Sequence, residues 1–330
     1  MRTATIKGVG HFTPNRKIPN SYFDDYYKKS IGPFLEEKRN IKQRFFMEDD
    51  QVTSDLIVEA SKKALNSAQL KVEDVDLIIV ATDTPDYISP STAAVVQHKM
   101  GAKNAGCFDI NSACAGFVTA IDMAWKYVKT DQQYDNILVV GAYGMSRYFD
   151  WDDYKITSMF GDGAGAVVIS STEEKGFLAS ELTADGQYHD YMGIYGGGTS
   201  QPFNPEMVQN KAHLLSFAKK IPPEHNVTAW PGMIHSILDR IQKKPNDVSK
   251  FFLTQLNIDT INASMEAIGV DRDRSHNVMD QFGYTGSACI PMALSDAVEK
   301  KAIQKGDLVF FLGSGGGLSQ AGIAMTWGMN

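Results

Sequence analysis

Two kinds of apolar pattern alternate along the chain. Short runs rich in β-branched residues predict buried strands, and stretches with an apolar residue every three or four positions predict amphipathic helices. Their alternation is typical of a layered α/β fold. The first part of the chain predicts helices over 53–69, 91–101 and 114–128, and strands over 76–82, 108–114, 136–142 and 163–171.

The second part of the chain repeats this order. It predicts helices over 235–242, 258–269 and 286–300, and strands over 251–256, 308–317 and 321–327. A strand, a glycine-rich turn and a second strand close each part, which suggests a duplicated α/β unit. We place the first half at 1–172 and the second at 173–330, although matching short apolar runs is weak evidence alone.

The segment 185–233 follows neither pattern. It is rich in Gly, Pro, Tyr and His, and contains the runs GIYGGGTSQPFNPEM and IPPEHNVTAWPGM. We interpret it as a long excursion over the surface, and irregular segments of this length are usually functional.

Composition and charge narrow the function classes. Of 330 residues, 43% are hydrophobic, and 32 Lys and Arg against 39 Asp and Glu give a net charge of −7. The apolar content excludes a disordered chain, and the longest apolar runs are too short to span a bilayer. The acidic balance argues against nucleic-acid binding, and an acidic carrier protein would need a local basic patch.

Cysteine usage and the N-terminus bear on the compartment. The three cysteines, Cys107, Cys114 and Cys289, are too few for a disulfide framework, and their odd number favours a reducing environment. The first residues, MRTATIKGVG, contain no long apolar segment of the kind found in secretory signals. We therefore expect a cytoplasmic protein that does not enter a membrane.

Cys114 has the setting of a candidate nucleophile. It lies in the run DINSACAGF, where a predicted strand meets a predicted helix through small residues. The free N–H groups and the dipole of a helix N-terminus favour a thiolate, and small neighbours leave room for a substrate. Alternatively, Cys114 is a small buried apolar residue, as most free cysteines are.

The glycine-rich run 313–317 is the second candidate. Backbone N–H groups that follow a buried strand can converge on a developing oxyanion. A phosphate cradle is less compatible with the run, because the spacing and the lysine of a P-loop are missing. A plain tight turn between two strands stays an alternative.

Taken together, these motifs resemble the β-ketoacyl-ACP synthase III family of the thiolase superfamily over essentially the whole chain. The matching runs are GVGHFTPNRKIPN, DINSACAGF, GDGAGAVVI, GYTGSACIPMAL and AIQKGDLVFFLGSGGG. The resemblance implies a five-layered αβαβα fold of two similar halves and a dimer. It also implies acyl transfer onto Cys114, with the backbone N–H groups of Cys114 and Gly316 as oxyanion donors. Acyl-CoA or phosphopantetheine-carried acyl groups would be the substrates, an acyl carrier protein would be a partner, and no bound cofactor or metal is implied.

The chain departs from the family at two catalytic positions. The family's His aligns with Thr254, and its Asn aligns with Tyr284, which replaces it in Gly-Tyr-Thr. A threonine hydroxyl does not act as a general base near neutral pH, and the tyrosine ring fills space where a malonyl extender would sit. The resemblance therefore predicts that decarboxylative elongation is lost, unless a histidine of the excursion (His189, His213 or His225) folds over the site.

The residues expected to bind substrate depart from the family less strongly. The family's Trp and Arg near the tunnel mouth align with Phe34 and Lys38, and Asn257 keeps a family position, whereas Asp259 reverses the charge of an Arg. Residues 83–92 align with a loop that crosses the dimer interface and shapes the partner's acyl pocket. Its candidate residues are Tyr87, Ile88 and Ser89, which would otherwise be simple interface contacts.

Three functions are compatible with these features. The first is a non-elongating acyltransferase, in which Cys114 accepts an acyl group and passes it to an acceptor or to water. The second is a catalytically inactive subunit that pairs with a complete ketosynthase as a heterodimer. The third is a ketosynthase whose departures are compensated by other groups. Divergence at the catalytic positions favours specialised metabolism over the initiation of fatty-acid synthesis.

Overall fold

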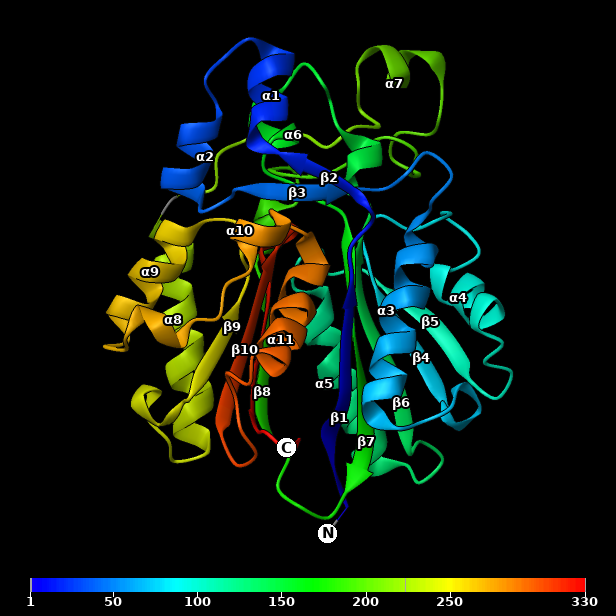
Figure 1. Cartoon of the computed structure of the whole chain (residues 1–330), viewed down its shortest axis with the longest axis vertical. Coiled ribbons are helices and arrows are strands. Elements are labelled where there is room, and N and C mark those ends of the chain that lie inside the picture. The colour runs from blue at the N-terminus through cyan, green and yellow to red at the C-terminus, as the bar shows by residue number, and fades with distance from the viewer. Residues whose placement is uncertain (1, 223, 330) are drawn as a thin grey trace.

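Two β-sheets lie side by side in the computed structural model, which describes residues 2–222 and 224–329 (Figure 1). The first sheet has the order β1-β7-β6-β4-β5, the second has the order β8-β11-β10-β9, and β2 pairs with β3. The strands are β1 (Thr3–Phe12), β2 (Arg16–Pro19), β3 (Gln43–Phe46), β4 (Leu77–Ala81), β5 (Gly106–Ile110), β6 (Asn136–Tyr143), β7 (Gly163–Thr172), β8 (Phe177–Ala184), β9 (Lys250–Leu253), β10 (Leu308–Gly315) and β11 (Ser319–Thr326).

Helices cover both sheets and fill the space between them (Figure 1). The outer layers are α3 (Thr53–Ala68) with α4 (Thr92–Met100) and α8 (Glu224–Arg240) with α9 (Ile258–Ala267). The middle layer is α5 (Gly116–Thr130) with α11 (Cys289–Glu299). This gives the predicted αβαβα order. The short helices gather at one end of the molecule: α1 (Asn20–Tyr27), α2 (Gly32–Arg39), α6 (Tyr154–Thr157), α7 (Pro205–Gln209) and α10 (Met279–Phe282).

The strands of the first sheet come from residues 3–172, and those of the second sheet come from residues 177–326. The last two strands of each half form an antiparallel pair: β6 with β7, and β10 with β11. The division of the chain at 172/173 into two similar halves stays an interpretation of this topology.

Glycines allow the strands to approach the helices closely, and they also hide β1 from the sequence pattern. A Cβ atom on Gly8 would lie 2.3 Å from the Ala64 carbonyl oxygen of α3, and one on Gly10 would lie 2.5 Å from the Ala64 nitrogen. Only glycine fits at these two positions. The same glycines interrupt the alternation that marks a strand, so β1 was not predicted from its pattern.

The predicted elements agree with the observed ones except at several ends. The strand predicted over 251–256 stops at Leu253, because the chain turns before Asn257 begins α9. The helix predicted over 114–128 begins only at Gly116, because Ala113 takes a left-handed φ of 46° and turns the chain. The position of Cys114 as the first residue of a helix was therefore wrong by two residues.

The excursion predicted over 185–233 is shorter than expected. Its last ten residues belong to α8, which contains Pro231 in its interior. A proline in a helix normally breaks it, but packing outweighs this effect at Pro231. The neighbouring Trp230 and Met233 are buried, and Met233 packs against Gly322 of β11, where a larger residue would clash. The described part of the remainder, 185–222, contains α7 and one short 3-10 turn as its only helical elements. No helix within the described ranges has both the length and the apolar character needed to cross a membrane.

Candidate active site

The parallel strands of the first sheet bring three segments of the chain to one edge. Ala81 of β4 pairs with Ile110 of β5 and with Gly141 of β6. Because parallel strands end at the same edge of a sheet, the residues that follow them lie close together there. Cys114 follows β5, and Tyr143 is the last residue of β6.

Cys114 sits in a tight turn just before α5. The Ala113 N–H donates to the Asn111 side-chain oxygen over 3.0 Å, and the Gly116 N–H donates to the Ala113 carbonyl oxygen over 2.9 Å. The side chain of Cys114 is only 3% exposed. The turn therefore fixes the thiol in the interior, at the junction of the first sheet and the central helix layer.

The glycine-rich run 313–317 packs directly against this turn. A Cβ atom on Gly315 would lie 2.6 Å from the Cys114 nitrogen, and one on Gly313 would lie 2.8 Å from the Ala115 Cα. Only glycine allows this approach. The two candidate motifs, which are about 200 residues apart in the sequence, therefore form one site. The role of the Gly316 N–H as an oxyanion donor stays a prediction.

The interior position changes the expected chemistry of the thiol. Burial raises the pKa of Cys114 far above its usual value, and the negative charge of Asp83 raises this pKa further, whereas the Tyr284 hydroxyl lowers it. The expectation that the helix N-terminus makes this thiol easy to ionise was wrong, because desolvation of the thiolate outweighs the helix dipole. Cys114 is a protonated thiol at neutral pH.

Thr254 holds the glycine-rich run in place. It is buried, its N–H donates to the Leu312 carbonyl oxygen over 3.0 Å, and its hydroxyl oxygen accepts the Ser314 N–H over 2.8 Å. The hydroxyl at the family's His position is therefore engaged by the backbone of β10. It contributes structure to the site and supplies no base.

Replacing Thr254 with valine should destabilise the protein. Valine keeps the shape but leaves the buried Ser314 N–H without its acceptor, which costs about 1–3 kcal/mol in the free energy of unfolding. Urea titration followed by circular dichroism measures this. Thr130→Val, which removes an exposed hydroxyl at the end of α5, should change the free energy by no more than about 0.5 kcal/mol. Equal effects of the two variants would contradict the role of Thr254.

Tyr284 occupies the other altered position and fills it with an aromatic ring. It is 1% exposed, and its ring centroid lies 5.3 Å from that of Phe160 and 6.3 Å from that of Tyr143. Burial raises the pKa of Tyr284 well above its usual value, and the nearby Cys114 raises it further. The phenol therefore stays protonated. Its oxygen is buried and has no hydrogen-bond partner within the described residues. The hydroxyl is therefore available to donate to a group bound at Cys114.

Phe34 lines a pocket of about 430 Å³ between α2 and α6. Its ring is 51% exposed, and the Arg39 guanidinium lies 5.5 Å from the ring centroid. Lys38 is exposed but does not line this pocket, whereas Arg39 does. The sequence alone could not show which cation of the run 38–44 lies beside Phe34. That choice depends on which face of α2 each residue occupies, and the face cannot be assigned before the ends of the helix are known. The remaining cations of the pocket are Lys29 and Lys155.

Asn257 and Asp259 have local roles at the start of α9. The Asn257 side chain caps the helix by accepting the Asp259 N–H over 3.1 Å. Asp259 is exposed in the first turn, where an acidic side chain is favoured by the helix dipole. Helix stability is thus sufficient to account for both residues, and substrate binding by Asn257 stays a prediction.

The loop that contains Tyr87, Ile88 and Ser89 projects from the molecule. Tyr87 is 58% exposed and Ile88 is 87% exposed, and Ser89 is also exposed. Exposed apolar side chains of this size are typical of a contact surface. Their role at a dimer interface stays a prediction.

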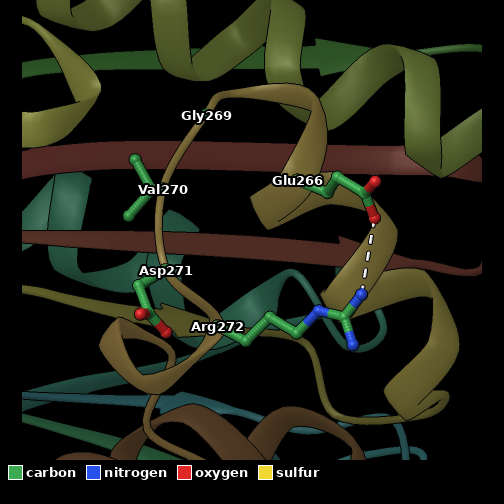
Figure 2. Close-up of a pocket in the computed structure, with 5 residues that line it drawn as sticks. All are labelled: Glu266, Gly269, Val270, Asp271 and Arg272. Atoms are coloured by element: carbon green, nitrogen blue, oxygen red, sulfur yellow. Dashed lines mark hydrogen bonds and ion pairs between the residues drawn. The ribbon is translucent and has the colours of Figure 1, made fainter.

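A second pocket, of about 380 Å³, lies after the C-terminal end of α9 (Figure 2). It is lined by Glu266, Gly269, Val270, Asp271 and Arg272, and the Arg272 guanidinium lies 3.4 Å from the Glu266 carboxylate. None of the predicted site residues lines it, so we do not assign it to the reaction.

The histidines of the excursion supply no evident base. His189 is exposed and contacts the Gly186 carbonyl oxygen over 3.1 Å, and the His225 ring lies 5.6 Å from that of Tyr188. Within residues 2–222 and 224–329, no histidine is among the groups that shift the pKa of Cys114. The acidic group that does so, Asp83, was missed in the sequence, although a carboxylate two residues after a buried strand is a usable signal.

Comparisons with known proteins agree with this geometry. Family models for 3-oxoacyl-[acyl-carrier-protein] synthase III and for its C-terminal part match residues 108–186 and 238–327. A β-ketoacyl-[acyl-carrier-protein] synthase III of Clostridium perfringens is 36% identical over 99% of this chain and 98% of the relative. The chain therefore belongs to the 3-oxoacyl-[acyl-carrier-protein] synthase III family.

Solved structures show the same fold. The β-ketoacyl-[acyl-carrier-protein] synthase III of Thermus thermophilus is 30% identical, with a TM-score of 0.88 over 98% of this chain and 99% of that one. The priming β-ketosynthase of the R1128 polyketide pathway is 26% identical, with a TM-score of 0.91 over 99% and 97% of the two chains. These similarities confirm the thiolase-like fold and fit the acyl-transfer class of reaction.

Proposed function

We propose that the protein is an acyltransferase that carries an acyl group on Cys114 without elongating it. The observation that carries this proposal is the contact between the Cys114 turn and the glycine-rich run, where Gly315 lies against the Cys114 nitrogen. A thiol beside converging backbone N–H groups is the minimum that acyl transfer to cysteine requires. The donor would be an acyl group on CoA or on the phosphopantetheine of a carrier protein.

In the loading step, the thiol of Cys114 attacks the carbonyl carbon of the donor thioester. The negative charge that develops on the carbonyl oxygen is met by the backbone N–H groups of Cys114 and Gly316. The Tyr284 hydroxyl adds a third donor, because it stays protonated and has no hydrogen-bond partner within the described residues. The donor thiol leaves with the proton from Cys114.

Elongation needs more than this. Decarboxylation of a malonyl thioester produces an enolate, which requires donors around its own carbonyl oxygen. The Thr254 hydroxyl already serves the Ser314 N–H, and the Tyr284 ring occupies space between Tyr143 and Phe160. Loss of a single oxyanion donor reduces the rate by about 10²–10³-fold in other enzymes. Replacement of both the His and the Asn donor therefore favours acyl transfer without loss of carbon dioxide.

The pocket beside Phe34 is our proposed entrance for a nucleotide-bearing donor. An exposed aromatic ring with Arg39, Lys29 and Lys155 around it offers a stacking surface and positive charge for phosphate groups. Phe34→Ala should raise KM for an acyl-CoA donor roughly 10-fold or more, because stacking of a base on an aromatic ring contributes about 1–3 kcal/mol. The value of kcat should stay unchanged.

Steady-state kinetics with acyl-CoA and with the same acyl group on N-acetylcysteamine test this role. The short donor lacks the nucleotide, so Phe34→Ala should leave its KM unchanged. Phe203→Ala, which removes an exposed ring in the excursion, is the matched control and should not alter either donor. A KM increase for both donors would contradict nucleotide binding at this pocket.

The direct test of the proposed function is mass analysis of the intact protein. The pure chain is incubated with a panel of acyl-CoA and acyl-carrier thioesters, with and without a malonyl thioester. We expect one acyl adduct per chain and no release of carbon dioxide. An unmodified protein with every donor would contradict the proposal.

A catalytically inactive partner subunit is the second candidate. The burial and the raised pKa of Cys114 favour it, and no histidine of the described residues is among the groups that shift this pKa. The exposed Tyr87 and Ile88 would then complete the acyl pocket of a related ketosynthase across the dimer interface. Stable 1:1 co-purification with such a ketosynthase, together with no adduct on Cys114, would support this role against the acyltransferase. A homodimer that forms the adduct alone would exclude it.

A further inference from the structure

Asp83 is a partly buried residue whose carboxyl group no part of the loading step uses. It comes two residues after β4, at the sheet edge where Cys114 follows β5 and Tyr143 ends β6. Its Oδ1 atom is buried and has no hydrogen-bond partner among the described residues. A carboxyl oxygen without a partner in the interior is unfavourable, so its position in this site calls for a role.

Hydrogen bonds fix the backbone on both sides of Asp83. The Thr82 N–H donates to the Ile110 carbonyl oxygen over 3.2 Å, next to the segment that leads to Cys114. On the other side, the Thr84 hydroxyl accepts the Gly144 N–H over 2.8 Å, and the Thr84 carbonyl oxygen accepts the Thr53 hydroxyl over 2.7 Å. The backbone of Asp83 is therefore held at the edge where β4, β5 and β6 end.

The electrostatics agree with this placement. The charge of Asp83 raises the pKa values of Cys114, Tyr143 and Tyr148, which agrees with the position of Asp83 at the sheet edge that Cys114 and Tyr143 share. Asp86 is the other acid of this loop whose charge raises the pKa of Tyr148. Its carboxylate already accepts hydrogen bonds from the N–H and the hydroxyl of Ser54. Asp83, by contrast, has a carboxyl oxygen without a hydrogen-bond partner among the described residues.

We propose that Asp83 is the general base of the second half-reaction, in which the acyl group leaves Cys114 for an acceptor that carries an O–H or N–H group. The inference rests on the proposed acyltransferase function and names its acceptor class. The loading step needs no separate base in this scheme, because the departing donor thiol takes the proton of Cys114. A hydroxyl or amine acceptor must lose a proton as it attacks, and Thr254, which stands at the family's His position, supplies no base to take it.

The step balances as follows. The Asp83 carboxylate takes the proton of the acceptor O–H or N–H while the acceptor atom bonds to the acyl carbon. The bond between that carbon and the Cys114 sulfur then breaks, and the sulfur leaves with the electron pair. The protonated Asp83 returns its proton to the sulfur. The products are the acyl ester or amide and a free Cys114 thiol, and Asp83 is again a carboxylate.

Burial raises the pKa of Asp83 to about 6, partly offset by a hydrogen bond from its own backbone N–H. A base must be deprotonated to act, so discharge of the adduct should rise with pH through about 6 and then level off. The groups that face Asp83 are Cys114, Tyr143 and Tyr148, whose pKa values are all raised, and they stay protonated over this range. The inflection therefore belongs to Asp83.

The test compares the wild-type protein with Asp83→Asn. Both are loaded with the acyl-CoA that gives an adduct, freed of excess donor, and followed by intact mass in water and in dilute ethylene glycol, whose hydroxyl groups do not titrate over this pH range. We expect the Asp83→Asn adduct to last at least about 10²-fold longer, because general bases contribute about 10²–10⁴-fold. The inflection near pH 6 should also disappear, and Asp83→Glu should restore part of the rate.

Iodoacetamide provides a readout that does not depend on acyl transfer. Removal of the Asp83 charge lowers the pKa of the neighbouring thiol, so Cys114 should be alkylated faster in Asp83→Asn while its adduct discharges more slowly. Asp50→Asn removes an exposed charge and should change neither rate, and thermal unfolding shows whether each variant is folded.

Equal discharge rates in folded wild-type and Asp83→Asn protein would overturn the role of Asp83 while leaving the acyltransferase function in place. Equal alkylation rates would overturn the placement of Asp83 beside the thiol. If neither protein forms an adduct with any donor, the proposed function fails, and the role of Asp83 fails with it.

Discussion

Cys114→Ala should form no acyl adduct with any thioester donor, and its transfer rate should fall by roughly 10⁴-fold or more, because loss of the nucleophile costs up to about 10⁶-fold in other covalent enzymes. The physical reason is that neither of the neighbouring hydroxyl groups is activated as a nucleophile. The Tyr284 phenol stays protonated, and the Thr254 hydroxyl is engaged by the Ser314 N–H. Intact mass and product formation measure the two effects.

Cys107→Ala is the matched control for this variant. Cys107 is partly exposed on β5, seven residues before Cys114, and burial raises the pKa of its thiol as well. Loss of this thiol should leave the adduct unchanged. An adduct that persists in Cys114→Ala and disappears in Cys107→Ala would show that the wrong cysteine has been assigned.

Restoring the two family residues should create an activity that the wild-type protein lacks. The double variant Thr254→His and Tyr284→Asn returns two hydrogen-bond donors for the enolate and removes the ring that fills the extender space. We expect release of carbon dioxide from a malonyl thioester to rise at least about 10²-fold over wild type, since one oxyanion donor alone contributes about 10²–10³-fold. Trapping of labelled carbon dioxide measures the rate.

The single variants separate the two contributions. Thr254→His removes the acceptor of the Ser314 N–H, so its stability must be measured beside its activity. Tyr284→Asn opens the space between Tyr143 and Phe160. A wild-type protein that already releases carbon dioxide as fast as the double variant would support the compensated ketosynthase. A folded and acylated double variant without any gain would show that these two positions do not limit elongation.

The fold could be predicted from the sequence where one periodic pattern dominates an element. Helix α4 ends at Gly101, which has the predicted left-handed conformation, and the buried strands β6 and β10 lie where the apolar runs placed them. Prediction failed where packing between distant segments decides the structure. Gly8 and Gly10 look like breaks in a strand but serve the approach of α3, and Pro231 looks like the end of a segment but lies within α8.

The candidate site was likewise only partly predictable from the sequence. The family motifs locate Cys114 and the two altered positions, yet they give no information on burial. Only the structure shows that Thr254 serves the Ser314 backbone and that desolvation raises the pKa of the thiol. The pairing of β4 with β5 and β6 also places Asp83 and Cys114 at the same edge of the sheet, which depends on strand order and not on sequence distance.

The central claim is that Cys114 carries an acyl group that is passed on without elongation. The most direct measurement follows the pure wild-type protein with acyl-CoA and a malonyl thioester, by intact mass and by release of carbon dioxide in the same reaction. We predict one acyl adduct, absent in Cys114→Ala, with no carbon dioxide and no product lengthened by two carbons. An unmodified Cys114, or carbon dioxide released together with a lengthened product, would contradict the claim.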